Sequence, residues 1–232
     1  MFALAWELAA RAIGGLLIPG FLEAIEGMVA LVSDGSAASA LYESNKSLVV
    51  GYGLAVVIGV PFGLLIGQHE LLERASNPYL NVLLVTPMAA LIPSFIIAFG
   101  VGLASRALLV CLFAVVMVVV NSRAGVRQVD PSLVEMARVY GASTVVIWRK
   151  VLLPGALPAV MAGLRIGLGR AISGVVIVEL LMAPAGIGAV ILDARDSFDA
   201  ASLYGMVLIV LIESVVLIEG LRLVERRFTN WR

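Results

Sequence analysis

Residues that could perform covalent chemistry are scarce in this chain. It has a single histidine, His69, and a single cysteine, Cys111, far apart in sequence. Zinc and similar ions need several His, Cys or carboxylate ligands at close spacing, and a hydrolytic zinc helix carries H-E-x-x-H. The sequence holds no such pattern, and one cysteine allows no intrachain disulfide. We therefore expect no metal ion in the chain and no catalytic set of an intramembrane enzyme.

The sequence also lacks the residues of a nucleotide-binding loop. A phosphate-binding loop of the form G-x-x-x-x-G-K-[ST] needs a lysine directly after a glycine. The only two lysines, Lys46 and Lys150, follow Asn45 and Arg149. Any ATP, with its Mg, must therefore be bound by another subunit. The 16 Lys and Arg residues balance 16 Asp and Glu residues, so no basic excess favours nucleic acid as a partner.

Three charged residues, Arg170, Glu179 and Glu213, stand inside long apolar stretches. A charge at membrane depth is unfavourable unless it pairs or faces an aqueous cavity, so such residues often mark solute pathways. We expect Arg170 to pair or to face a cavity, with Glu213 as one conceivable partner, and Glu179 to line an outer gate. Prolines kink helices and free backbone carbonyls toward a cavity, although they also occur in harmless kinks. The candidate residues of a translocation path are Pro87, Pro93, Arg170, Ser173 and Glu179.

The elements that hold these residues are predicted to be membrane-spanning helices. Of the 232 residues, 61% are apolar and 14% are charged, and the mean hydropathy is +1.06, which excludes a water-soluble globule. Because a span needs about 20 mostly apolar residues, we expect an all-α, polytopic transmembrane helical bundle of about six spans, in a single domain over residues 1–232. The expected spans cover 2–18 (short or truncated), 47–67, 80–100, 106–121, 156–183 and 203–218. A further helix over 21–32 is expected to lie in the membrane interface, with Phe21, Ile25, Met28 and Val32 on one face.

Basic residues sort the loops by side of the membrane, because short loops rich in Lys and Arg stay in the cytoplasm. Five basic residues lie in 122–154 and four in the tail after 219, whereas 33–46 and 184–202 carry one each beside several acidic residues. We therefore expect a multi-pass protein with 122–154 and the C-terminus in the cytoplasm, and with 33–46 and 184–202 outside.

The basic segment 122–154 contains the pattern of a helix, a turn and a second helix. Asp130 is a suitable N-cap, and Pro131 suits the first helical position. Gly141 fits a left-handed turn, Ser143 can cap a second helix, and Pro154 is expected to end it. A two-faced hairpin of this kind either docks into a partner or only returns the chain to the membrane.

The spacing within this hairpin is specific. It resembles a signature of permease subunits of binding-protein-dependent ABC importers. That signature reads E-A-A, three residues, G, nine residues, and I-x-L-P. The matching positions here are Glu135, Ala137, Gly141, Val151, Leu153 and Pro154. Met136 and Val151 are mild departures from it. The segments 83–102 and 162–191 and the tail around Trp231 resemble the subgroup that imports sulfonates, taurine and nitrate. The resemblance covers roughly residues 40–232.

This resemblance implies the type I ABC importer permease fold and an ATP-driven importer in a bacterial cytoplasmic (inner) membrane. Residues 122–154 would then be a cytoplasmic coupling helix-turn-helix that docks on an ABC ATPase dimer. The implied coupling residues are Glu135, Met136, Ala137, Gly141, Leu153 and Pro154. The other implied partners are an extracytoplasmic solute-binding protein, which would dock near 186–198, a second permease copy that would form a homodimer, and membrane lipid.

A stripe of small residues recurs every four positions in the fourth firm span: Gly155, Ala159, Gly163, Gly167 and Ala171. Small residues let helix backbones approach closely. The stripe therefore indicates a permease–permease contact, a path surface, or ordinary packing within one subunit.

An ion-coupled secondary transporter is the alternative function, in which Arg170, Glu179 and Glu213 would supply binding or relay charges. It would work without ATPase partners. It leaves the signature of residues 135–154 unexplained, and the sequence shows no convincing inverted repeat.

Overall fold

The computed structural model describes residues 6–7, 10, 18–182 and 184–229, and these ranges contain helices and no strand. The first expected span, 2–18, lies largely outside the described residues. The helices are α2 (Phe21–Ser33), α3 (Ser36–Gln68), α4 (Glu70–Val85), η1 (Met88–Leu91), α5 (Ile92–Phe99), α6 (Leu103–Arg127), α7 (Pro131–Val139), α8 (Thr144–Ile147), η2 (Trp148–Leu152), α9 (Leu153–Leu181), α10 (Gly186–Asp196) and α11 (Ala200–Thr229).

Four described helical stretches are long and apolar enough to cross a membrane: Ser36–Gln68, Leu103–Arg127, Thr144–Leu181 and Ala200–Arg227. They contain four of the expected spans. A fifth crossing results if α4 and the η1–α5 segment are counted together. The bundle is thus the all-α, polytopic arrangement that the composition predicts.

The expected span over 80–100 is broken at Pro87, one of the candidate kink prolines. The chain bends by 91° between Val85 and Met88. Thr86 is extended, with ψ of 126°, because a following proline disfavours the helical conformation. Pro87 also lacks the N–H that would continue the helix.

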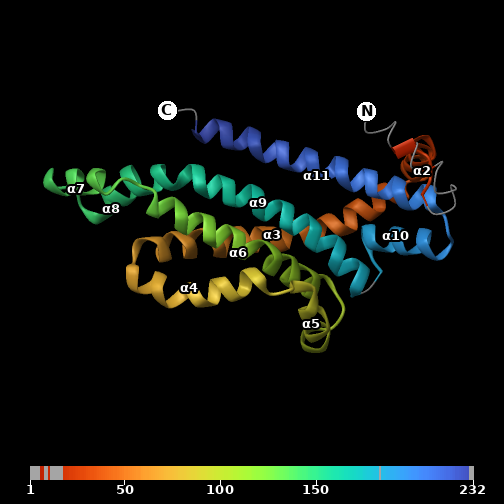
Figure 1. Cartoon of the computed structure of the whole chain (residues 1–232), viewed down its shortest axis with the longest axis horizontal. Helices are drawn as coiled ribbons and strands as arrows, with labels where there is room; N and C mark the ends of the chain where they lie inside the picture. Colours follow the sequence, from red (N-terminus) through yellow and green to blue (C-terminus); the bar gives the residue numbers. More distant parts are fainter. Residues whose placement is uncertain (1–5, 8–9, 11–17, 183, 230–232) are drawn as a thin grey trace.

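The core of the bundle is α6, which lies between α3 and α9 (Figure 1). Small residues make this close packing possible. A Cβ added at Gly63 of α3 would stand 2.5 Å from the backbone oxygen of Val119, and one added at Gly163 of α9 would stand 2.5 Å from Cβ of Asn121. A second stripe with a period of four therefore exists on α3, comprising Gly51, Ala55, Gly59, Gly63 and Gly67.

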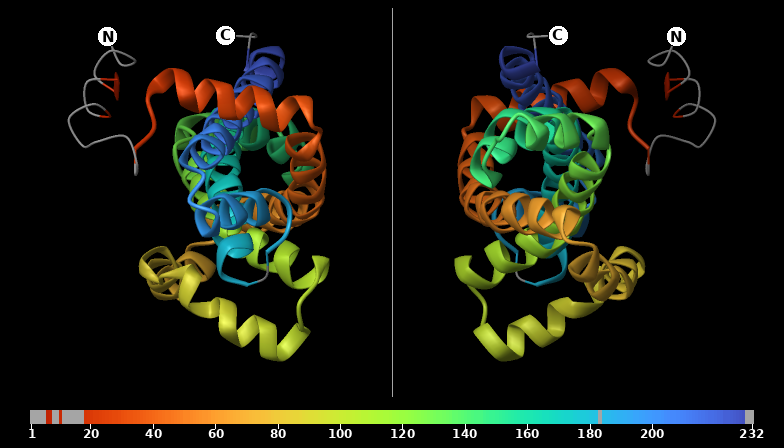
Figure 2. Two further views of the ribbon diagram at one scale, coloured as in Figure 1. Left: turned by 90° about the vertical axis from the view of Figure 1, so that its right-hand side faces the viewer. Right: turned by 90° about the vertical axis from the view of Figure 1, so that its left-hand side faces the viewer.

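The remaining helices lie at the two ends and along the sides of this core. Helices α7 and α8 form one end of the molecule, and α2 and α10 lie at the other (Figure 1). Seen end-on, α4 and α5 lie to one side of the core (Figure 2). Helix α11 runs beside α9 and contacts α2 and α10.

Helix α2 is present where the sequence predicts it, and the residues that it buries are other than Phe21, Ile25, Met28 and Val32. Its buried residues are Ala24, Gly27 and Leu31, whereas Val32 is exposed. A Cβ on Gly27 would stand 2.2 Å from the backbone oxygen of Ala201 in α11. The closest contact therefore centres on a glycine, which a pattern of large apolar residues does not reveal.

The predicted turn between two helices within 130–154 is largely confirmed. The Asp130 side chain accepts a hydrogen bond of 2.9 Å from the backbone N–H of Ser132, and Gly141 has φ of 75°. The expected end of the second helix at Pro154 is wrong, because the chain stays helical from Thr144 to Leu181. A π-helical turn, η2, directly precedes Leu153 and changes the backbone hydrogen-bond pattern just before Pro154, which lacks an N–H to donate.

Candidate functional site

Helix α7 presents two different faces at the end of the molecule. Val134 and Ala137 pack on a cluster that includes Ile147 and Leu152, so one face is fixed to the bundle. The opposite face leaves large apolar side chains uncovered in this chain, namely Leu133, Met136, Val139 and Tyr140, with Val139 85% and Tyr140 84% exposed. An apolar helix face of this kind is the usual form of a groove-docking element.

The predicted coupling residues are distributed around α7. Glu135 is exposed and lines a hollow of about 360 Å³ between α7 and the end of α6. A second hollow of about 580 Å³ lies on the other side of α7 and is lined by Met136, Ala137 and Pro154. Leu153 is exposed beside it. The turn at Gly141 thus brings both halves of the signature to one end of the molecule.

The start of α7 is held by its cap. The Ser132 backbone N–H donates to Asp130, and this bond holds the pKa of the Asp130 carboxyl below its ordinary value. A negative charge at this position also interacts favourably with the N-terminal end of the helix dipole. The orientation of the exposed α7 face therefore depends on a local polar contact as well as on packing.

Two of the predicted path residues meet at the break after α4. Pro87 and Arg170 both line a cavity of about 190 Å³, together with Leu83, Phe113 and Met117. No hydrogen bond or ion pair joins Arg170 to another residue within the part of the chain that the structure describes. The pairing of Arg170 with Glu213 is wrong, because Glu213 instead accepts a hydrogen bond of 2.5 Å from the Asn45 side chain.

The other path candidates are placed differently. Ser173 is exposed one turn beyond Arg170, and its hydroxyl donates to the backbone oxygen of Gly169 at 3.1 Å. Pro93 lies in the first turn of α5 and is not among the residues that line the cavity. Glu179 is completely buried and faces protein. The stripe from Gly155 to Ala171 packs largely against α6 of the same chain, as the contacts of Gly163 and Gly167 illustrate.

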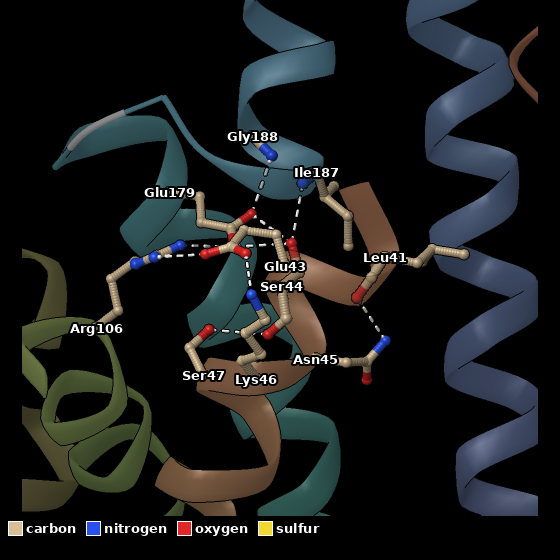
Figure 3. Close-up of polar contacts among 10 residues, drawn as sticks. All are labelled: Leu41, Glu43, Ser44, Asn45, Lys46, Ser47, Arg106, Glu179, Ile187 and Gly188. Atoms are coloured by element: carbon tan, nitrogen blue, oxygen red, sulfur yellow. Dashed lines mark hydrogen bonds and ion pairs between the residues drawn. The ribbon is translucent and has the colours of Figure 1, made fainter. Parts of the chain in front are cut away.

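Sequence reasoning did not foresee the polar cluster around Glu179 (Figure 3). The carboxylate accepts from the Ser44 hydroxyl at 2.8 Å and from the Gly188 backbone N–H at 3.0 Å. Arg106 lies 3.8 Å from it and donates to Glu43 at 3.1 Å. The cluster lies at the end of the bundle opposite α7. The closely spaced Gly186 and Gly188 were the only sequence signal for it.

At the α7 end, ion pairs join helices that otherwise touch little. Arg165 of α9 lies 3.2 Å from Glu225 of α11. Arg127 of α6 pairs with Glu73 of α4, and Arg123 donates to Asn77 at 2.6 Å. Polar contacts therefore fix the ends of α11 and α4 to the core.

Comparison with known proteins identifies the architecture. Residues 59–230 match the family model described as binding-protein-dependent transport system inner membrane component. The putative aliphatic sulfonates transport permease protein SsuC of Bacillus subtilis is 33% identical over 83% of this chain and 68% of its own length. The taurine transport system permease protein TauC of Escherichia coli is 31% identical over 82% of this chain and 70% of its own length.

A solved structure agrees in fold. The MetNI methionine ABC transporter in an inward-facing conformation matches with a TM-score of 0.65 and 22% identity, over 82% of this chain and 93% of that chain. These matches give no support to an ion-coupled secondary transporter. The chain belongs to the family of binding-protein-dependent transport system inner membrane components, and it is a permease subunit of an ABC importer.

Proposed function

We propose that this chain forms, with a second copy of itself, the membrane path of an ATP-driven importer in which the exposed face of α7 docks on a cytoplasmic ABC ATPase. The observation that carries the docking role is the uncovered apolar face of α7, which includes Met136, Val139 and Tyr140. It coincides with the signature that begins at Glu135.

The proposed roles of the other subunits follow from the missing nucleotide-binding motif and from the two ends of the bundle. The sequence contains no phosphate-binding loop, so ATP and Mg belong to the ATPase dimer. In this proposal the C-terminal end of α11 lies on the cytoplasmic side with α7, and the end that carries α10 faces the solute-binding protein outside. Solute then crosses by alternating access as the ATPase subunits close and reopen.

The proposed solute is a small organic anion of the sulfonate type. Two observations support it: the relatives named for aliphatic sulfonates and taurine, and Arg170 in the cavity at the Pro87 break. A guanidinium at membrane depth that has no partner among the described residues is suited to a transient anionic ligand.

The docking role is tested by co-purification with the ATPase encoded beside the permease. Glu135→Arg and Gly141→Asp should lose the ATPase subunit or its regulated hydrolysis, because the first reverses a charge on α7 and the second strains a turn with φ of 75°. Glu26→Arg is the matched control, since it makes the same charge reversal on an exposed residue of α2, at the opposite end. Equal ATPase retention by all three variants would overturn the docking role.

A further inference from the structure

Helix α10 lacks a cap of its own. Its N-cap residue, Ala185, has no side chain that could accept from the first backbone N–H groups. Groups on two other helices supply the missing acceptors. The hydroxyl of Ser44 in α3 accepts from the Ile187 N–H at 2.9 Å, and the carboxylate of Glu179 in α9 accepts from the Gly188 N–H at 3.0 Å. The start of α10 is thus capped by the spans.

The two capping groups are themselves joined. Ser44 donates its hydroxyl proton to Glu179, at 2.8 Å from each carboxylate oxygen. The hydroxyl therefore uses its one proton on Glu179 and a lone pair on Ile187. Both the Ser44 hydroxyl and the Gly188 N–H donate to the Glu179 carboxyl group, so these contacts link α3, α9 and α10 through one buried side chain (Figure 3).

Glycines let α10 approach closely enough for these bonds. A Cβ on Gly186, whose φ is 53°, would stand 2.1 Å from the Ser44 hydroxyl oxygen. A Cβ on Gly188 would stand 2.5 Å from Cβ of Glu179. The two glycines of the Gly-Ile-Gly sequence at 186–188 thus leave the space in which Ser44 and Glu179 reach the backbone of α10.

The fourth helix in the cluster is α6. Arg106 lies between the Glu179 and Glu43 carboxylates, at 3.8 and 3.1 Å, and Lys46 pairs with Glu43 at 2.6 Å. Two cations therefore balance two carboxylates. All three core helices, α3, α6 and α9, contribute a side chain to the cluster that holds α10.

We propose that Glu179 is a positioning residue that locks α10 to the outer ends of the core helices, so that α10 and these ends move as one body during the transport cycle. The lock would let a force applied at α10 reach the spans. That a solute-binding protein applies this force rests on the proposed function, whereas the lock itself does not.

The test uses the permease–ATPase complex in lipid nanodiscs and hydrogen–deuterium exchange of the peptide that contains Ile187 and Gly188. In the wild type, exchange should stay slow both without nucleotide and with ATP and vanadate. In Glu179→Gln it should rise at least tenfold in both states, because the amide offers one acceptor oxygen where the carboxylate offers two. Ser44→Ala, which removes only the hydroxyl, should also raise the exchange rate of this peptide.

Ser47→Ala is the matched control. Ser47 is as buried as Ser44 and lies one turn along the same helix, but its hydroxyl donates only to the backbone oxygen of Ser44, at 2.8 Å. This variant should exchange like the wild type. Wild-type exchange rates in Glu179→Gln and Ser44→Ala would overturn the lock, as would a large difference between the two nucleotide states of the wild type.

A second readout separates positioning from mere stability. ATP hydrolysis is measured with and without the solute-binding protein encoded with the transporter, loaded with taurine. The ratio of stimulated to basal hydrolysis should fall at least threefold in Glu179→Gln and Ser44→Ala and stay at the wild-type value in Ser47→Ala. A ratio unchanged despite faster exchange would overturn the positioning role. If the wild type is not stimulated at all, the proposed function fails, and the exchange data decide the lock alone.

Discussion

At the scale of single residues, Arg170 and Glu179 illustrate two ways of placing a charge in a membrane protein. Both lie on α9 and nine residues apart, yet Glu179 is completely buried and Arg170 is exposed in the single chain. Ser44 and the Gly188 N–H donate to Glu179 and Arg106 forms an ion pair with it, whereas Arg170 lines a cavity. The proposed holding role of Glu179 and the proposed solute-facing role of Arg170 rest on this difference.

Replacing Arg170 should weaken transport of anions. Arg170→Gln is expected to reduce taurine uptake into proteoliposomes about tenfold, because a hydrogen bond to a charged group contributes about 1.5–3 kcal/mol and 1.4 kcal/mol corresponds to a factor of ten. Arg170→Lys should retain part of the uptake, since it keeps the positive charge. Arg74→Gln, on an exposed arginine of α4, serves as the control. An equal loss of taurine uptake in Arg74→Gln would contradict a specific role of Arg170.

The Asp130 cap makes the start of α7 sensitive to acid. Because its folded pKa is lowered, its contribution to α7 is present above the unfolded value, about 3.9, and is lost as the pH falls through the folded pKa. A spin label at Val139 should therefore become more mobile below about pH 4. Asp130→Asn keeps a capping oxygen without a charge, so this acid response should disappear in it. An identical response in both proteins would show that another group is responsible.

At the scale of elements, the bundle is organised by two stripes of small residues that face α6 from opposite sides. The stripe on α9 was visible in the sequence, and the structure assigns it largely to contacts with α6. The matching stripe on α3 includes Gly51, Gly59 and Gly63. Close backbone approach is the source of stability here, because helices in lipid gain no hydrophobic drive toward one another.

Enlarging a stripe residue should separate α3 from α6. Gly63→Leu places side-chain atoms where a Cβ would already stand 2.5 Å from the Val119 backbone oxygen. We expect loss of the folded peak in fluorescence-detected size-exclusion chromatography, since overpacking of a tight site costs about 1–3 kcal/mol or more. Gly53→Leu on the same helix meets no atom within 4 Å and should elute like the wild type. Loss of the peak in Gly53→Leu but not in Gly63→Leu would contradict this assignment of faces.

At the scale of the whole molecule, the single chain leaves apolar side chains uncovered on two surfaces, one along its membrane spans and one on α7. The first surface includes Val57 of α3, Val85 and Ile97 on α4 and α5, and Val216 of α11, and the second includes Val139. Lipid or a second copy can cover the first surface, whereas α7 extends past the end of the core (Figure 1). The proposed assembly places the second copy within the membrane and the ATPase at α7.

The assembly predicts a definite stoichiometry. Native mass spectrometry of the wild-type complex released from detergent should show two copies of the 24.4 kDa chain with two ATPase subunits. Tyr140→Asp should leave the two permease copies together and reduce the ATPase content, because its 84% exposed side chain lies on α7, away from the α4 and α5 surface. A complex with one permease chain would contradict the homodimer.

The sequence by itself determined the membrane bundle, the position of four spans, the turn at Gly141 and the signature that begins at Glu135. These features follow from hydropathy over about 20 residues and from caps and turns, which depend on neighbours in the chain. Only the tertiary structure decided the size of the bend at Pro87, the partner of Glu213 and the contact between Ser44 and Glu179. Ser44 and Glu179 are 135 positions apart, so their contact arises only when the small-residue stripes bring α3 and α9 against α6, and no local pattern encodes it.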